Sequence, residues 1–414
     1  MHFVKSIFCL FLLFQIYTLE DLFEKYYRKL DQTTLSFQRS LTHDIDWTNR
    51  LIGIKGARGA GKTTLLLQHA RQDLPGDGKT LYASLDDLYF TENRLFDLAD
   101  SFRKQGGQYL LLDEVHRYGN WSQELKNIYD DFADLRIIFT GSSIIHLDRA
   151  KGDLSRRALL YELPGLSFRE FLQVTTGNTF SKITLEQLLA DHVEIARTVT
   201  DKLRPLEHFK KYLQYGYYPY FLENEKAYLQ KLAETISLAL TSDLPAIHPV
   251  SYATIEKIRL LLRIIAESVP FKPNIAKLSE HTGVTRGSVS TFIRYLEDMR
   301  IIRGLYAAGD GMTLLQKPEK IYLHHPNLIF SLSSNRADTG NIRETFFINQ
   351  ASAAMPVAYA EEGDFIIDKH TFEVGGRSKK RRQIKHLENA YIAADDIEIG
   401  HQQRIPLWLF GFFY

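Results

Sequence analysis

The chain has 414 residues, of which 44% are hydrophobic and 24% charged, an ordinary composition for a globular protein of two to four domains. Its net charge of +1 excludes a general electrostatic attraction to nucleic acid or membranes, so such binding would require a local patch. The single cysteine, Cys9, excludes an internal disulfide framework and favours a reducing compartment.

The N-terminus begins with an apolar stretch that follows Lys5 and resembles the core of a signal peptide. It is too short to span a bilayer and lacks a cleavage site with small residues. We therefore expect a cytoplasmic protein without stable membrane association, while secretion or anchoring stays the alternative. Leu19 to Arg39 has helical periodicity, which predicts an N-terminal helical segment (1–45) beside the next domain.

The stretch GARGAGKTT lies between a short apolar strand, Leu51 to Ile54, and a helix that begins at Lys62. Glycines in a strand-to-helix loop turn backbone N–H groups toward an anion, and the helix N-terminus adds partial positive charge. This P-loop spacing predicts an ATP site in which Lys62 reaches the β- and γ-phosphates and Thr63 ligates Mg²⁺. The predicted nucleotide-binding residues are Gly56, Ala57, Arg58, Gly59, Ala60, Gly61, Lys62, Thr63 and Thr64.

Strand-like and helical segments alternate downstream, which predicts a parallel sheet with helices on both faces. The strand that begins at Tyr109 ends in Asp113 and Glu114, at the sheet edge where open α/β folds bind ligands. Asp113 is the predicted Mg²⁺ ligand, and Glu114 is the predicted residue that polarises the attacking water. Two solvated acids at the end of a strand are the alternative.

The next strand ends in FTGSS, which places Thr140, Ser142 and Ser143 near the same edge. A hydroxyl there would contact the γ-phosphate or the attacking water, but helix capping is an equally good explanation. Arg156 and Arg157 are candidates to stabilise transition-state charge, and a solvated surface pair is the alternative.

Several motifs together resemble the AAA-type ATPases of bacteria and archaea, of the additional-strand P-loop class. They are GARGAGKTT, YLLLDEVHR, IIFTGSS, SRRALLYELPGLSFREFL, YLQYGYYPYF and FEVGGRSKKRRQIK. The resemblance implies a P-loop NTPase core (46–200), a helical connector (201–252), a winged helix (253–310) and an α/β restriction-endonuclease-like domain (311–414). It also implies a phosphate site at Gly56 to Thr64, a metal and catalytic pair at Asp113 and Glu114, and a sensor around Ser142.

The segment from Thr254 to Tyr306 reads as a helix, then two short helices around a glycine turn, then a strand. If this helix-turn-helix binds DNA, the second helix exposes residues toward the major groove and the backbone. These residues are Arg286, Ser288, Thr291 and Arg294. A hinge or a protein-binding module is an equally good interpretation. The tyrosine-rich connector is expected to be packed rather than to stack on bases.

Asp364 and Glu373 have the spacing of the two acids of a Mg²⁺-dependent nuclease, with Glu344 as a helical third acid. The lysine expected two residues after the second acid is Gly375, so we expect a degenerate domain unless Arg377 or Lys379 substitutes. The basic run from Arg377 to Lys385 would grip phosphates or form a solvated loop.

The sequence thus predicts an ATPase that uses ATP and Mg²⁺ as a conformational switch acting on DNA or on a protein client. Three alternatives stay open: a P-loop kinase, for which Ser84 to Asp87 would be an acceptor site, an ATP-regulated nuclease, and a nucleotide-gated interaction module without turnover.

Overall fold

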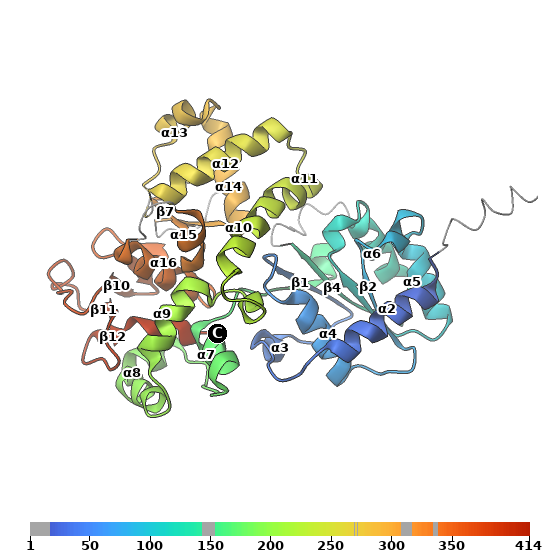
Figure 1. Ribbon diagram of the computed structural model, residues 1–414, viewed down its shortest axis with the longest axis horizontal. Coiled ribbons are helices and arrows are strands. Elements are labelled where there is room, and N and C mark those ends of the chain that lie inside the picture. Colours follow the sequence, from blue (N-terminus) through green and yellow to red (C-terminus); the bar gives the residue numbers. More distant parts are fainter. Residues whose placement is uncertain (1–16, 143–153, 269, 271, 308–316, 334–337) are drawn as a thin grey trace, which may run out of the picture.

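A five-stranded parallel sheet forms the lobe at the right of Figure 1, with the strand order β2-β3-β4-β1-β5. The computed structural model describes residues 17–142, 154–268, 270, 272–307, 317–333 and 338–414, so the apolar N-terminal stretch and Ser143 lie outside the described residues. The strands are β1 (Leu51–Gly56), β2 (Thr80–Ser84), β3 (Tyr109–Asp113), β4 (Arg136–Ser142) and β5 (Leu159–Glu162). The predicted parallel sheet is confirmed.

Helices lie beside this sheet in Figure 1. They are α2 (Leu19–Gln32), α3 (Leu41–Asp44), α4 (Lys62–Asp73), α5 (Leu95–Lys104) and α6 (Trp121–Asp131). Helix α2 buries Leu22 and Tyr26, four residues apart, and contacts β2 and α4. It ends at Gln32 rather than near Arg39, because the following residues are extended and Arg39 turns into the protein interior.

A helical region connects this first lobe to a second lobe, which contains the C-terminal residues and lies at the left of Figure 1. Its helices are α7 (Phe168–Thr176), α8 (Leu185–Thr200), α9 (Pro205–Tyr215), α10 (Tyr228–Leu238), the π-helical turn η7 (Ala239–Asp243), α11 (Leu244–Ile247), α15 (Pro326–Leu332) and α16 (Thr339–Ser352). Tyr217 and Tyr218 are 2% and 4% exposed, so the tyrosine-rich segment is packed as expected. One contiguous hydrophobic core runs through both lobes, and within the described ranges no helix has the length and apolar content needed to cross a bilayer.

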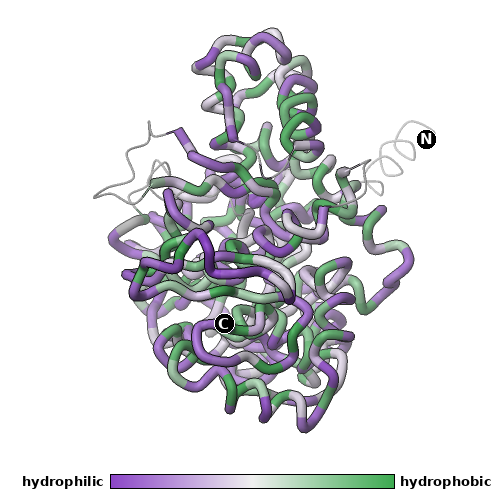
Figure 2. The backbone as a smooth tube through the Cα atoms, turned by 90° about the vertical axis from the view of Figure 1, so that its left-hand side faces the viewer, coloured by the Kyte–Doolittle hydropathy of each residue, from purple (hydrophilic) through white to green (hydrophobic). Residues whose placement is uncertain are grey.

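Three helices project at the top of Figure 1, followed by a hairpin. They are α12 (Tyr252–Glu267), α13 (Ile275–Thr282) and α14 (Arg286–Asp298), and the hairpin pairs β6 (Ile302–Leu305) with β7 (Lys320–Leu323). Figure 2 shows hydrophilic and hydrophobic residues alternating along these helices, as one-sided packing requires. The winged helix was expected to end at residue 310. Strand β7 lies beyond that boundary but pairs with β6, so the hairpin extends past it.

The second sheet has the order β12-β11-β10-β9-β8. Its strands are β8 (Ala358–Tyr359), β9 (Phe365–Ile367), β10 (His370–Gly375), β11 (Ala390–Ala394) and β12 (Arg404–Pro406). Strands β8, β9 and β10 are antiparallel neighbours, whereas β10, β11 and β12 run parallel. Helix α16 packs on β10. The short helix η8 (Leu407–Phe412), in which Trp408 is buried, packs against α16 and α7.

Candidate nucleotide-binding site

The loop between β1 and α4 has the backbone conformation that its glycines permit. Gly59 and Gly61 have φ angles of +85° and +96°, in the left-handed region that residues with a Cβ rarely adopt. Lys62 is buried, and its ammonium donates to the carbonyl oxygens of Gly56, at 3.0 Å, and Ala57, at 3.3 Å. The lysine therefore lies along the concave side of the loop, where a phosphate chain would run.

The Asp113 carboxylate is the centre of a hydroxyl cluster at the end of β3. It accepts a hydrogen bond from Thr63 Oγ1 at 2.6 Å and from the Tyr82 hydroxyl at 2.8 Å. The Thr140 hydroxyl donates to its other oxygen. Burial and the adjacent charge of Asp113 raise the pKa of Tyr82, so this phenol stays protonated and donates. The structure thus brings together the two predicted metal ligands, Thr63 and Asp113, which come from different elements.

Glu114 follows directly and has a left-handed backbone, with φ +53° and ψ +41°. Such a conformation costs free energy in a residue with a Cβ and is concentrated at functional sites. Its amide donates to the Thr140 hydroxyl at 3.2 Å, and one carboxylate oxygen lies 3.2 Å from His116 Nδ1. Glu114 lines a cavity of about 320 Å³ together with Thr63 and Asp113.

Asp243, from the π-helical turn η7, reaches this site from the connector and was not found by sequence reasoning. It is 4% exposed and accepts from Arg58 Nη2 at 2.9 Å and Arg117 Nη2 at 2.8 Å. Its Oδ1 also lies 3.7 Å from His116 Nε2. Burial alone would raise the pKa of Asp243, but hydrogen bonds from His116 and Arg58 outweigh it and lower the pKa to about 2. The connector is thereby ion-paired to the loop between β1 and α4.

The tyrosine-rich segment also contacts this loop. A Cβ added to Gly59 would lie 2.7 Å from the Tyr220 ring, and one added to Gly61 would lie 3.8 Å from Pro219. Tyr220 in turn stacks on Tyr228, with ring centroids 5.1 Å apart. The loop glycines therefore also permit close packing of the connector, a role that sequence reasoning did not assign to them.

Arg39 fixes the other side of the loop. Its guanidinium is buried and donates to the carbonyl oxygens of Ala60, Pro164 and Gly165, at 2.7 to 2.9 Å. It also contacts Glu170 Oε1 at 3.1 Å. No motif indicated this residue, because its partners are more than twenty positions away in the sequence.

Three further residues were predicted from the sequence as catalytic: Ser142, Arg156 and Arg157. Ser142 is the last residue of β4, in register with Gly56, and its amide donates to His116 Nδ1 at 3.3 Å. Arg156 is exposed at the end of a short 3₁₀ helix. Arg157 donates to both carboxylate oxygens of Asp130 on α6, at 2.8 and 3.0 Å. The sensor and arginine-finger roles stay predictions.

The three acids of the predicted nuclease-like domain are paired with lysines. Lys320 Nζ lies 3.6 Å from Glu344 Oε2 and 3.7 Å from Asp364 Oδ1, and sequence reasoning missed this lysine. Lys379 Nζ lies 2.9 Å from Glu373 Oε1. Among the described residues there is no cluster of three or more His, Cys, Asp or Glu side chains suited to a metal ion.

Lys379 lies beside both Glu373 and Gly375, the position at which a nuclease lysine was expected. A Cβ added to Gly375 would lie 2.6 Å from Lys379 Cγ, so the lysine side chain covers the glycine. Within the basic run, Lys379 is engaged with Glu373, and Arg381 donates to the Ala390 carbonyl at 3.1 Å. The exposed basic residues are Arg377, Lys380, Arg382 and Lys385.

Two family models match the chain. Residues 48–172 match a family described as an AAA domain, and residues 206–339 match a domain of unknown function. The first range contains the loop, Asp113 and Glu114, so the chain contains an AAA-type P-loop domain. The second range spans most of the connector and the region from α12 to α15.

An uncharacterized protein of Methanocaldococcus jannaschii is 28% identical over 285 residues, which are 66% of this chain and 60% of that protein. The chain therefore matches less than two thirds of the length of this relative. Among solved structures, AMPPCP-bound DnaA from Aquifex aeolicus is 17% identical with a TM-score of 0.26, covering 69% of this chain and 92% of that one. The Aeropyrum pernix ORC1 protein in complex with DNA is 12% identical with a TM-score of 0.29, covering 78% and 91%. Both scores are too low to support an inference about this chain.

Proposed function

We propose that the protein binds ATP with Mg²⁺ and hydrolyses it, and that hydrolysis changes how the connector sits on the phosphate-binding loop. The observation that carries this proposal is the 2.6 Å contact between Thr63 Oγ1 and Asp113 Oδ2, directly beside Lys62 and Glu114. A hydroxyl at the start of a P-loop helix and a carboxylate at the end of a nearby strand are the protein ligands with which such sites hold Mg²⁺.

The residues present fit a nucleotide and its metal ion. The left-handed Gly59 and Gly61 allow the loop backbone to turn its amides toward phosphate oxygens. Thr63 and Asp113 would hold the Mg²⁺, while the hydroxyls of Tyr82 and Thr140 orient the Asp113 carboxylate. When bound, Mg²⁺ supplies charge neutralisation at the β- and γ-phosphate oxygens.

Glu114 is the proposed general base. Its strained backbone directs it into the cavity that Thr63 and Asp113 also line, where it can accept a proton from water. His116 Nδ1 accepts from the Ser142 amide and lies 3.2 Å from the Glu114 carboxylate, while its Nε2 lies 3.7 Å from Asp243 Oδ1. A change at Glu114 is thereby linked to the connector through one imidazole.

The target of the switch is proposed to be DNA or a protein client, reached through α12 to α14 and the β6–β7 hairpin as a winged helix. Arg286 is exposed at the start of α14, where a recognition helix meets DNA. Glu297 accepts from the Gly304 amide at 2.7 Å and the Tyr306 hydroxyl at 2.8 Å. This acid is therefore engaged with the hairpin and does not oppose a phosphate backbone.

A nuclease function has less support. The acids Glu344 and Asp364 share the counter-charge of Lys320, and Glu373 is neutralised by Lys379. We propose a degenerate nuclease-like domain that does not cleave DNA, because these ion pairs occupy the acids that would hold Mg²⁺. The position of Lys379 beside Glu373 is the observation that favours the nuclease alternative. Cleavage that requires Mg²⁺ and is lost in Glu373→Ala would overturn this.

A phosphotransferase is the second candidate, because Ser84 and Asp86 line the same cavity as Glu114. In a phosphotransferase the acceptor would occupy this space in place of water. Steady phosphate release from ATP without any added acceptor would argue against it.

Melting of the protein with and without ATP and Mg²⁺ tests the nucleotide site. A ligand at a hundred times its Kd adds about 2.7 kcal/mol to the free energy of unfolding, which is readily seen as a higher Tm. We expect the shift to disappear in Lys62→Ala and to persist in Lys104→Ala, an exposed lysine on α5. A wild-type protein whose Tm does not respond to ATP and Mg²⁺ would exclude the proposed site.

A further inference from the structure

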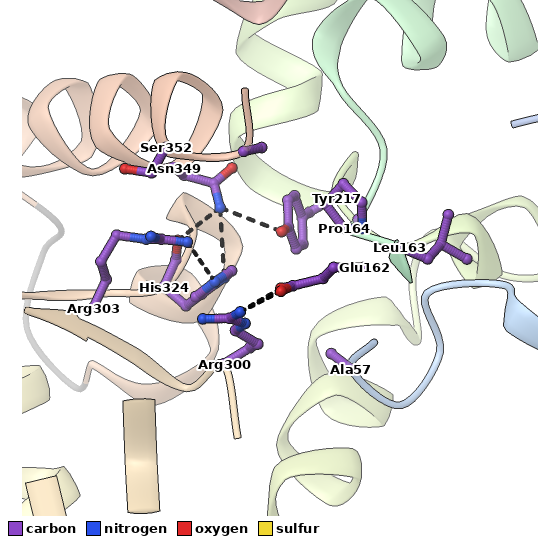
Figure 3. A pocket seen from close by; sticks show the side chains of 12 residues that line it. Ala57, Glu162, Leu163, Pro164, Tyr217, Arg300, Arg303, His324, Asn349 and Ser352 are labelled. Atoms are coloured by element: carbon purple, nitrogen blue, oxygen red, sulfur yellow. Dashed lines mark hydrogen bonds and ion pairs between the residues drawn. The ribbon is translucent and has the colours of Figure 1, made fainter. Parts of the chain in front are cut away.

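A second cavity, of about 130 Å³, lies where three parts of the chain meet (Figure 3). Ala57 and the segment from Glu162 to Gly165 line it from the first lobe. Arg300 and Arg303 line it from the start of the β6–β7 hairpin, and α16 closes it. It is separate from the cavity that contains Asp113 and Glu114, and the proposed function assigns it no role.

One of its two arginines is already paired. Arg300 Nη2 lies 2.5 Å from the Glu162 carboxylate, and Lys55 Nζ lies 3.9 Å from the same group. Burial alone would raise the pKa of Glu162, but the charge of Arg300 outweighs burial and lowers it, so this acid is ionised. The Glu162 carboxylate is therefore the shared counter-ion of Arg300 and Lys55.

The other arginine lacks an acidic partner. Within the described part of the chain, no carboxylate lies within 4.0 Å of the Arg303 guanidinium, whose Nη2 instead lies 3.1 Å from His324 Nε2. Burial, together with the charge of Arg303, lowers the pKa of His324 well below its usual value, so this ring is neutral. A partly buried guanidinium without a counter-ion costs free energy that an anion would recover.

A buried hydroxyl adds a third donor. Tyr217 is 2% exposed, and its oxygen accepts from Asn349 Nδ2 at 3.3 Å. Its own O–H has no acceptor among the described residues. In Figure 3 this hydroxyl and the guanidinium groups of Arg300 and Arg303 point toward the same space. Convergent donors with one shared acid are the arrangement that binds an oxyanion.

We propose that this cavity binds the phosphate group of a small molecule, with Arg303 and the Tyr217 hydroxyl as its principal donors. A cavity of about 150 Å³ admits a molecule of the size of benzene, so one of this size admits a phosphate group and excludes a nucleoside. Free phosphate and a small phosphomonoester share this chemistry.

The position of the cavity gives such a ligand a structural consequence. The Leu163 carbonyl lies against Gly56, where an added Cβ would approach it to 2.5 Å, and the Leu163 amide donates to the Lys55 carbonyl at 2.8 Å. A phosphate group bound to Arg303 and Tyr217 would therefore join the P-loop lobe to the hairpin and α16.

The test uses the full chain with Lys62→Ala, which weakens phosphate binding at the P-loop. We expect inorganic phosphate to raise its Tm by several degrees relative to potassium chloride of equal ionic strength. The added Arg303→Gln change should abolish this rise without lowering the Tm in chloride, because no carboxylate loses a partner. Arg263→Gln, an exposed arginine on α12 paired with Glu267, should leave the rise unchanged.

Tyr217→Phe removes one donor and should raise the half-saturating phosphate concentration about tenfold, the usual effect of a hydrogen bond to a charged group. If Arg303→Gln does not fold, Tyr217→Phe is the variant that tests phosphate binding in this cavity. Glycerol 3-phosphate distinguishes the two possible ligands. A Tm rise with inorganic phosphate alone identifies the free ion as the ligand, whereas a Tm rise with both compounds identifies a phosphomonoester group. No Tm rise in Lys62→Ala, a rise retained in Arg303→Gln, or half-saturation unchanged in Tyr217→Phe would overturn the proposal.

Discussion

The Asp243 carboxylate lies 2.9 Å from Nη2 of Arg58, which joins the connector to the phosphate-binding loop by a largely buried ion pair. Arg58 is part of the loop that is proposed to hold ATP phosphates. The same guanidinium therefore has two potential anionic partners, one on the connector and one on the nucleotide. If ATP binds as proposed, competition between these two partners would give nucleotide binding a direct means of releasing the connector.

Removal of this carboxylate is expected to strengthen ATP binding. Asp243→Asn frees Arg58 for the phosphates and removes a negative charge from their surroundings, so we expect the Kd for ATP to fall about tenfold, a change of about 1.4 kcal/mol. Calorimetric titration of both proteins measures it. Glu267→Gln, which removes the partner of Arg263 on α12, is the control and should leave the Kd unchanged. A Kd that is equal or higher in Asp243→Asn would show that Asp243 does not compete.

The stabilisation from Asp243 should depend on pH. Its pKa is about 2 in the folded protein, below its usual value of 3.8, so the carboxylate stabilises the fold above pH 4. This contribution is lost as the pH falls from about 4 toward 2. We expect wild type to exceed Asp243→Asn by about 2 kcal/mol in unfolding free energy at pH 7, and by progressively less below pH 4. Urea unfolding at several pH values tests this, and a difference independent of pH would contradict it.

The Arg39–Glu170 pair should be essential to the fold around the loop. Glu170 is 1% exposed, so Arg39→Met leaves a buried, uncompensated carboxylate and should lower the unfolding free energy by about 3–5 kcal/mol. In Arg39→Met/Glu170→Gln the negative charge is gone, and the single amide oxygen replaces one of the two carboxylate oxygens, which accept from the Ser40 amide and the Ser167 amide respectively. We therefore expect the double variant to be more stable than Arg39→Met in urea unfolding, and the reverse order would refute the role of the buried charge.

Two surfaces are candidates for DNA, and salt dependence separates them. Few phosphate contacts predict a modest slope of log K against log salt, about 0.9 for each neutralised phosphate. Arg286→Ala should weaken binding to duplex DNA and lower the slope if α14 is used. Arg377→Ala/Lys380→Ala should do so if the exposed part of the basic run is used. Fluorescence anisotropy at several salt concentrations measures both, and no binding at low salt would favour a protein client.

The parts of the site that were predicted from sequence are those encoded within a few residues. The loop from Gly56 to Thr64 and the pair Asp113 and Glu114 follow from local spacing, because each lies at the end of a strongly apolar strand. Their neighbourhood in space follows from the order of a parallel sheet. Helix α2 was expected to be longer, because periodicity does not reveal where a chain turns inward.

The contacts that sequence could not reveal are those made between distant elements. Asp243 lies 185 positions from Arg58, within a helix whose polar residues look like a solvated face. Tyr82 was part of a buried strand, and no pattern indicated that its hydroxyl meets Asp113. Lys320, on β7, likewise approaches Glu344 on α16 and Asp364 near β9, which no local sequence pattern indicates.

Phosphate release by wild type and Glu114→Gln, with ATP and Mg²⁺ and no added acceptor, is the most direct test of the proposed ATPase. Glu114→Gln keeps the size of the side chain and removes its basicity, so ATP affinity should be retained while turnover slows by about 10² to 10⁴. Glu24→Gln, on the exposed face of α2, serves as the control and should turn over like wild type. Steady release by wild type and its loss in Glu114→Gln is the predicted result. ATP binding without any release, or equal turnover in the two proteins, would contradict it.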